Sequence, residues 1–249
     1  MIHLKNRNQI DKMRIAGRLT KAALNYLGEN LRPGISTAYL DRLACDFIRK
    51  NGGEPSFLNY HGYPSSVCVS VNDEVVHGMP GERIINEGDI VSIDIGAYIG
   101  GYHGDCAKTF AVGEISDDAK KIIEVTRASF YEGLKYAVAG KRIGDISHAI
   151  QSYAEERGCS VVRDLVGHGI GEAMHEDPSV PNFGNAGRGV RLVKGMTLAI
   201  EPMINLGGYK VTTDANGWTV RTSDGSLSAH YENTILITDG EPEILTTAD

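Results

Sequence analysis

Four acidic residues and one histidine in this chain have the types and the spacing of a buried ionic site. Asp94 follows the apolar run 90–93, and Glu201 follows the largely apolar run 197–200. A carboxylate on or beside a buried strand rarely lacks a partner, because an unpaired buried charge is costly. Both acids are therefore candidates for a site inside the fold.

The spacing of acids and glycines recurs in the two halves of the chain. In each half one acid follows a glycine by six residues, and a second acid precedes a glycine by eight. The pairs are Gly88 with Asp94 and Gly195 with Glu201, then Asp105 with Gly113 and Glu232 with Gly240. Either spacing alone would be weak, but both in the same order favour a duplicated unit. Four acids thus occupy equivalent places in two half-chains.

Carboxylates that meet between two such halves need a counter-charge. If the halves pack about a pseudo-twofold axis, two carboxylates ~4 Å apart repel by about 4 kcal/mol at an effective dielectric constant of 20. Raised pKa values relieve one or two of these contacts, whereas two divalent cations cancel four charges. The pattern therefore predicts a site for two metal ions.

His168 is the candidate imidazole ligand, within the glycine-rich segment 167–171. We expect its glycines to let the backbone turn tightly and to leave room around the ring. An ordinary loop histidine remains an alternative; a phosphate-binding loop is disfavoured because no Lys-Ser or Lys-Thr follows. A carboxylate-rich site with one imidazole favours manganese, iron, cobalt or zinc over calcium.

The elements that would position these residues follow the same order in both halves. Apolar periodicity predicts a helix over 10–31, and a second helix begins near Thr37 and ends at Gly52-Gly53. Strands are expected at 67–71, 90–95 and 105–112. In the second half a helix opens at Ser116, and Asp145 opens another that ends near Gly158. Strands are then expected at 161–166, 196–200 and 231–238.

Length, charge and cysteine usage limit the class of protein. A chain of 249 residues with 41% hydrophobic composition is expected to form a single domain, residues 1–249. The net charge of −7 disfavours nucleic acid and anionic lipid as partners. Charged residues throughout the first thirty positions exclude a signal peptide there, and four cysteines without a C-x-x-C pair suit reduced thiols. We therefore expect a cytoplasmic protein.

Eight segments together resemble the type I methionine aminopeptidases over essentially the whole chain. They are Gly62-Tyr63-Pro64, Asn72 through His77-Gly78, Ile93-Asp94, His103-Gly104-Asp105, 167–171, His175-Glu176, Ile200-Glu201-Pro202-Met203 and Tyr231-Glu232-Asn233-Thr234. The resemblance implies an α+β pita-bread fold, with two pseudo-symmetric helix-helix-strand halves around a curved antiparallel sheet. It also implies removal of the initiator methionine from nascent polypeptides with a small second residue.

The resemblance assigns the metal ligands residue by residue. Asp94 would bind one ion, Asp105 and Glu232 would bridge both, and His168 with Glu201 would complete the second. The resemblance implies two divalent metal ions, and the candidate elements are cobalt, manganese, iron, zinc and nickel. Hydroxide between them would attack the scissile carbonyl, since a metal ion lowers the pKa of bound water.

Two further histidines and the same glutamate are implied as catalytic residues. His175 would hydrogen-bond the scissile carbonyl oxygen, and His77 would contact the scissile nitrogen or the backbone beyond it. Glu201 would also carry a proton. Apart from the resemblance, a surface or capped histidine is the alternative at each position, and for His77 it is the favoured one.

The family pattern also implies a methionine pocket and a monovalent cation site. The pocket residues would be Tyr60, Tyr63, Cys68 and Trp218. At its edge Phe57 and Met174 stand where some members have cysteine and phenylalanine, which leaves inhibitor selectivity open. Asn72 and Ser228 match positions beside a sodium or potassium ion, although a plain turn would use the same residues.

Several alternatives share this scaffold. The chain has no expected amino-terminal extension and no type II insertion between His175 and Glu201, as in the minimal bacterial form. An aminopeptidase or dipeptidase specific for X-Pro peptides would use the same five ligands, and a non-catalytic relative would have lost some. The resemblance implies nascent N-termini as partners, transient ribosome contact and a monomer.

Overall fold

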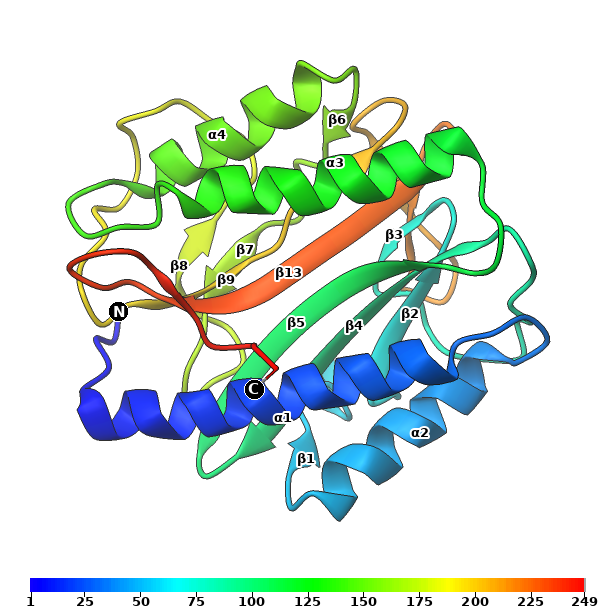
Figure 1. Ribbon diagram of the computed structural model, residues 1–249, viewed down its shortest axis with the longest axis horizontal. Helices are drawn as coiled ribbons and strands as arrows, with labels where there is room; N and C mark the ends of the chain where they lie inside the picture. The colour runs from blue at the N-terminus through cyan, green and yellow to red at the C-terminus, as the bar shows by residue number, and fades with distance from the viewer. Residues whose placement is uncertain (249) are drawn as a thin grey trace.

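The computed structural model describes residues 1–248, and it has four α-helices beside a large antiparallel sheet. The helices are α1 (Arg7–Asn30), α2 (Thr37–Lys50), α3 (Asp117–Leu134) and α4 (Ile143–Glu155), with a short 3-10 helix η1 (Tyr60–Gly62). Figure 1 shows α1 and α2 beside one half of the sheet, and α3 and α4 beside the other. The expected order of two helices followed by strands in each half is confirmed.

The main sheet has eleven strands, and a smaller sheet of three strands lies beside it. The strands are β1 (Glu54–Pro55), β2 (Val67–Val71), β3 (Glu74–Val76), β4 (Ile90–Ile99), β5 (Tyr102–Ala111), β6 (Ser160–Val161), β7 (Gly167–Gly169), β8 (Glu176–Val180), β9 (Thr197–Ile200), β10 (Met203–Asn205), β11 (Val211–Thr213), β12 (Val220–Thr222), β13 (Ser228–Leu236) and β14 (Glu243–Ile244). The central path of the large sheet runs β1-β4-β5-β13-β9-β7-β8, and the small sheet runs β11-β12-β3.

Side-chain caps explain where most of the helices begin. The side chains of Asn6, Ser36 and Ser116 each accept a hydrogen bond from a backbone N–H in the first turn of α1, α2 and α3. Helix α4 begins at Ile143, two residues earlier than expected. Asp145 is its third residue, and its carboxylate accepts from the backbone of Arg142 at 2.8 Å.

The two halves repeat each other at the level of backbone hydrogen bonds. Gly88 has φ +90° and donates to Val112 O at 2.8 Å; Gly195 also has φ +90° and donates to Ile237 O at 3.0 Å. Such positive φ values favour glycine. The glycines that recur in the sequence therefore make the same turn before β4 and before β9.

The helices cover one face of the sheet and leave the acids on the other. A Cβ atom on Gly104 would lie 2.9 Å from the backbone of Ala16 in α1, and the Tyr231 ring packs 5.3 Å from Phe130 in α3. Since successive side chains of a strand point to opposite faces, Asp105 and Glu232 point away from the helices. The hydrophobic cores under each helix pair thus support one face of the sheet, and the helices do not cover the face that carries the acids.

Several strands differ from their expected bounds, and β5 and β13 each begin three residues earlier than expected. Strand β4 continues to Ile99, because 90–99 pairs with β5 along its whole length. The prediction of a strand over 161–166 is wrong. In that region the strand β6 contains only Ser160 and Val161, because it pairs only with the short β10. Within the described part of the chain, no helix is long and apolar enough to cross a membrane.

Candidate metal centre

Five neighbouring strands of the large sheet each bring one predicted ligand to the same place. Adjacent in the sheet are β4, β5, β13, β9 and β7. These carry, in that order, Asp94, Asp105, Glu232, Glu201 (the residue after β9) and His168. The five residues are therefore brought together by sheet order, although they are spread over 139 positions of the chain.

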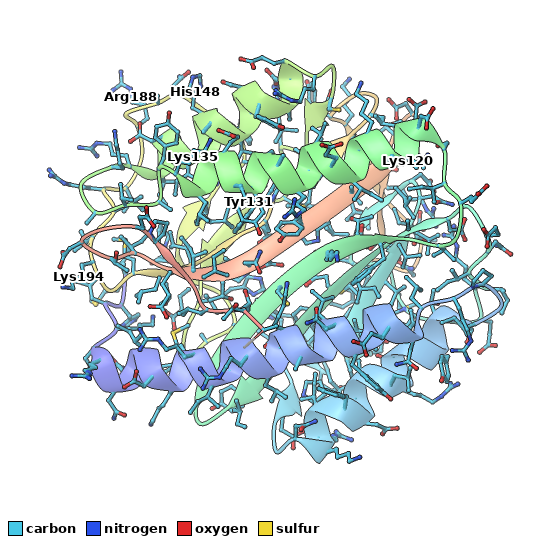
Figure 2. The ribbon with its side chains drawn as sticks, viewed as in Figure 1. Lys120, Tyr131, Lys135, His148, Arg188 and Lys194 are labelled. Carbon is cyan, nitrogen blue, oxygen red and sulfur yellow. The ribbon has the colours of Figure 1, made fainter. Side chains whose placement is uncertain are left out.

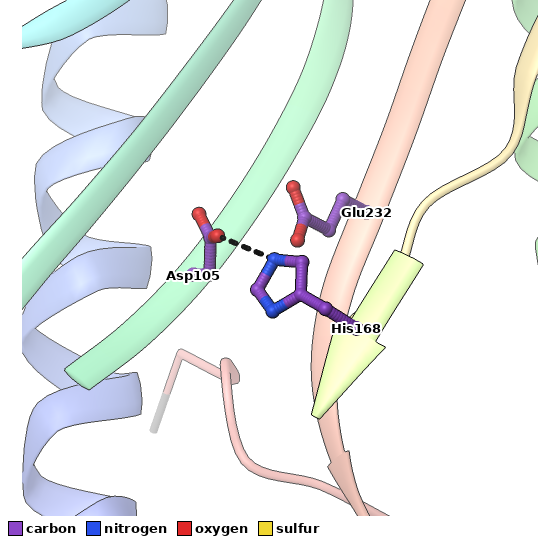
Figure 3. A group of neighbouring side chains, drawn as sticks. All are labelled: Asp105, His168 and Glu232. Carbon is purple, nitrogen blue, oxygen red and sulfur yellow. Dashed lines mark ion pairs between the residues drawn. The ribbon is translucent and has the colours of Figure 1, made fainter. Parts of the chain in front are cut away.

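The donor atoms are spaced as ligands of shared ions would be. One donor atom each from Asp105, His168 and Glu232 lies within 4.8 Å of the others, and Figure 3 shows the three side chains pointing toward one another. His168 Nε2 is 3.7 Å from Asp105 Oδ2 and 3.6 Å from Glu201 Oε1. Two ligands about 2.1 Å from one ion are separated by comparable distances in tetrahedral or more open geometry.

The acids are electrostatically strained without a cation. Burial raises the pKa of Asp105 to about 8. Burial also raises the pKa values of Asp94, Glu201 and Glu232 well above their usual range, and repulsion from neighbouring carboxylates adds to the effect. One oxygen each of Asp94, Asp105 and Glu232 is buried with no hydrogen-bond partner in residues 1–248. This donor set fits divalent metal ions, which would supply those missing partners.

His168 is held in the form that a metal ligand requires. Its Nδ1 lies 2.8 Å from Gly169 O, so Nδ1 carries the hydrogen and Nε2 presents a lone pair to the acids. Burial lowers the pKa of His168 to about 4, which keeps the ring neutral.

The glycines around His168 act through close packing instead of a turn. The segment 167–169 is strand β7, so the expectation of a tight turn is wrong. A Cβ atom on Gly167 would lie 2.4 Å from Ala199 O, and one on Gly169 would lie 2.2 Å from Asp177 O. Only glycine lets β7 approach both of its neighbours closely enough to deliver the imidazole.

A cavity of about 230 Å³ opens beside the acids. It is lined by Phe57, Tyr60, His61, Tyr63, Cys68, His77, Asp94, Asp105, His168, Met174, His175, Glu201, Trp218 and Glu232. All four predicted pocket residues, both histidines predicted to be catalytic and all five predicted ligands are in this set. The cavity therefore combines a charged side with an apolar side.

The apolar side of the cavity has its polar groups occupied elsewhere. The Tyr63 hydroxyl lies 3.2 Å from Val67 O and 3.3 Å from Gly78 O, and the Tyr63 ring packs edge-on to Trp218 at 5.1 Å. Burial raises the pKa of the Cys68 thiol well above its usual value, so the sulfur is uncharged. This wall offers aromatic rings and a neutral sulfur to a ligand side chain.

His175 lies exposed at the rim of the cavity and is oriented by Tyr60. The Tyr60 hydroxyl is 2.8 Å from His175 Nδ1, and the two rings stack with centroids 5.2 Å apart. This contact leaves Nε2 of His175 free for a ligand. Tyr60, predicted as a pocket residue, therefore also positions a histidine.

A buried ion pair anchors the strand that follows His175. Lys5 Nζ lies 2.5 Å from Glu176 Oε2, and the side chain of Lys5 is 3% exposed. The other oxygen of Glu176 accepts from Ala173 N at 3.3 Å. The amino-terminal segment is thus attached to the loop that carries His175.

The small sheet carries His77 and Trp218 into the cavity. Val76 pairs with Val220, and the Thr219 hydroxyl contacts both His77 O at 3.4 Å and Met79 N at 3.2 Å. His77 has φ +56°, a strained conformation for a residue with a side chain, and such strain is commonly found at functional sites. Burial lowers the pKa of His77.

Asn72 and Ser228 are brought together, with their polar groups already paired. Ser228 N donates to Asn72 O at 2.9 Å, the Ser228 hydroxyl donates to Ile204 O at 3.3 Å, and the Asn72 amide donates to Asp89 at 2.8 Å. The monovalent cation expected there stays a prediction.

Two histidines of this region were missed in the sequence. His61 lines the mouth of the cavity with φ +50°, between Tyr60 and Gly62. His230 is buried two residues before Glu232, and strand alternation from Glu232 would have identified it. His61 has no comparable signal, because nothing in its local sequence shows which way the loop folds.

Comparison with known proteins settles the family. The sequence model of metallopeptidase family M24 matches residues 11–239. The chain belongs to this family. A methionine aminopeptidase of Clostridium acetobutylicum is 56% identical over 250 residues, covering 100% of both chains. The resemblance inferred from the motifs is thereby confirmed.

Solved structures of the family confirm the fold. The crystal structure of methionine aminopeptidase from Thermotoga maritima superposes with a TM-score of 0.97 at 45% identity, covering 99% of this chain and 100% of that one. An Xaa-Pro dipeptidase from Bacillus anthracis gives 0.81 at 26% identity, and the match covers 99% of this chain but only 62% of the dipeptidase. The predicted α+β fold around an antiparallel sheet is correct.

Proposed function

We propose that this chain is a metal-dependent aminopeptidase that removes methionine from the amino terminus of peptides whose second residue is small. The observation that carries the proposal is the cavity of about 230 Å³, in which an apolar wall lies directly beside the five convergent donors. A pocket of this size holds a single side chain, so the bond next to the donors is the first peptide bond of the substrate. The methionine aminopeptidases similar along the full chain support the same reaction.

The metal-binding residues in this proposal are Asp94, Asp105, His168, Glu201 and Glu232. Two divalent ions bound there would polarise the scissile carbonyl and make water nucleophilic near neutral pH. Cobalt, manganese, iron, zinc or nickel suits this mixture of carboxylate and imidazole. A sodium or potassium ion beside Asn72 and Ser228 is the further cation that we propose.

The chain's own residues bind and orient the substrate. The methionine side chain lies against Tyr63, Cys68 and Trp218, where its flexible thioether fits between aromatic rings and a neutral thiol. His175, with Nδ1 held by Tyr60, directs Nε2 at the carbonyl oxygen as negative charge develops.

Proton transfer is assigned to the residues at the scissile nitrogen. His77 faces the scissile nitrogen, and Glu201 carries the proton that this nitrogen must gain when the bond breaks. Such contacts commonly contribute about 10²–10⁴-fold in rate.

The substrate is tested with two tripeptides. Purified protein supplied with manganese is expected to cleave Met-Ala-Ser at least about 100-fold faster than Ala-Pro-Ala, since loss of favourable pocket contacts of about 3 kcal/mol changes a rate by that factor. The reverse preference would replace the proposal with an X-Pro peptidase. Chelated protein should be inactive and recover when manganese is returned, and full activity after chelation would exclude the metal site.

Nascent polypeptides are the proposed substrates in the cell, which places the enzyme in the cytoplasm with transient access to the ribosome. A monomer is proposed because one chain supplies all five donors and the complete pocket wall. Sedimentation of the metal-loaded protein tests that state directly.

A further inference from the structure

His230 lies buried beside the proposed metal donors, and the function proposed above gives it no task. It stands on β13 two residues before Glu232, so both side chains point to the same face of the sheet. The residue is 1% exposed, and neither ring nitrogen has a hydrogen-bond partner within residues 1–248. Because an unpartnered buried imidazole is costly, its place in the fold requires an explanation.

Two imidazoles flank the Glu201 carboxylate, one at each oxygen. His168 Nε2 lies 3.6 Å from Oε1, and His230 Nε2 lies 3.8 Å from Oε2. The Nδ1 of His168 is bonded to Gly169 O, which leaves Nε2 as a lone pair for metal. No such bond fixes His230 within the described residues, so its Nε2 is free to carry the hydrogen.

The distances place His230 just outside hydrogen-bonding range of the acids. Its Nε2 is also 3.9 Å from Glu232 Oε2, and an N–H···O bond is normally shorter than about 3.2 Å. A shift of less than about 1 Å closes either gap. Side chains next to a metal site commonly donate to the ligating carboxylates and so fix which oxygen faces the ion.

We propose that His230 is a positioning residue for Glu201. When metal is bound, its Nε2–H donates to Oε2 of Glu201, and Oε1 is thereby kept turned toward His168 and the ions. Glu201 is the partner, in preference to Glu232, because its oxygens already divide between the two imidazoles. The inference rests on the proposed metal site.

The test is calorimetric titration of chelated protein with manganese(II). His230→Leu removes the donor and is expected to weaken manganese binding by about 10–100-fold, whereas His230→Gln keeps a donor and should retain the wild-type affinity. His148→Leu, on the outer side of α4 (Figure 2), is the control and should bind as the wild type does. If the leucine variant fails to fold, His230→Phe keeps a ring without a donor and carries the same expectation.

The outcomes separate this inference from the proposed function. Wild-type affinity in His230→Leu or His230→Phe would overturn the positioning role while leaving the metal site in place. A changed visible spectrum of cobalt-loaded His230→Gln would also overturn it, because it would make the ring a ligand instead of a donor to a ligand. Wild-type protein that takes up no manganese would remove the metal site itself.

Discussion

Asp105 lies on a strand that has an acid-bearing strand on either side. Its strand, β5, lies between β4 and β13, and its Oδ2 faces His168 Nε2 at 3.7 Å. The Thr234 hydroxyl contacts both the N and the O of Asp105, at 3.0 and 2.9 Å, which fixes the backbone under the carboxylate. A change confined to this side chain therefore tests the site without moving the strand.

The substitution Asp105→Asn is expected to abolish cleavage of Met-Ala-Ser with the fold intact. An amide keeps the shape of the carboxylate but cannot supply the charge that a bridging ligand provides. In the metal-free state the variant should be at least as stable as the wild type in urea, since it removes a carboxyl whose charged form is disfavoured by burial. Normal turnover by the variant with manganese would remove Asp105 from the site.

Tyr60→Phe separates the orientation of His175 from the apolar wall. The ring remains, and only the hydroxyl that contacts Nδ1 is lost. A hydrogen bond of about 0.5–1.5 kcal/mol corresponds to a fall of about 2–10-fold in kcat, with KM for Met-Ala-Ser little changed. A rise in KM alone would assign the tyrosine to the pocket only.

The site residues were predictable where the two halves of the chain repeat the same spacing. They were less predictable where a contact depends on how two loops pack together. The four acids stand at recurring distances from glycines, so the sequence contains their equivalence. The contact between Tyr60 and His175 joins residues 115 positions apart. Its geometry is set by the packing of two loops and leaves no local pattern.

The loop that carries His175 is held in place by the segment that precedes α1, through Lys5. Lys5 and Glu176 form a buried pair, and removing one partner of such a pair commonly costs about 3–5 kcal/mol because the other charge stays buried. Lys5→Met is therefore expected to lower the free energy of unfolding by about 3 kcal/mol and to reduce kcat.

A double variant and a surface variant are the controls for this prediction. Adding Glu176→Gln to Lys5→Met removes the unpaired charge, keeps an acceptor for Ala173 N, and should restore much of the stability. Lys194, labelled in Figure 2, forms an exposed pair with Asp239, and Lys194→Met should change stability by less than about 1 kcal/mol. Equal losses in Lys5→Met and Lys194→Met would show that burial of the Lys5 pair is unimportant.

Most elements were predictable because their signals are local, and the exceptions have tertiary causes. Helices α1, α2 and α3 begin where polar caps precede apolar periodicity. The tight turn predicted for the glycines of β7 is wrong, because these glycines are required by the close approach of Ala199 and Asp177, which the adjacent sequence does not show. Likewise, β6 is short because its partner β10 is short.

At the scale of the whole molecule, the metal-free protein is expected to lose stability between pH 7.5 and 8.5. Burial raises the pKa of Asp105 to about 8, and the other three acids shift in the same direction. The folded state then binds more protons than the unfolded state, whose carboxyl pKa values are near 4, so stability falls with rising pH until the folded carboxyls have themselves ionised. Each titrating carboxyl contributes at most about 1.4 kcal/mol per pH unit.

Urea unfolding of chelated protein at the two pH values measures this effect. The buried histidines do not oppose it in this window: the pKa of His168 is lowered to about 4, and unfolded histidines are largely neutral above pH 7.5. Manganese should abolish or reverse the trend, because ionised carboxylates are the form that binds metal. A chelated protein that becomes more stable from pH 7.5 to 8.5 would contradict the raised pKa values.

The boundary between β5 and β13 runs through the middle of the donor set. These strands pair directly over only three positions, 106–108 with 231–233. A chain nicked in the exposed connection before α3 would keep two donors on one fragment and three on the other. Ion uptake by the nicked protein would then report whether its two fragments had recombined.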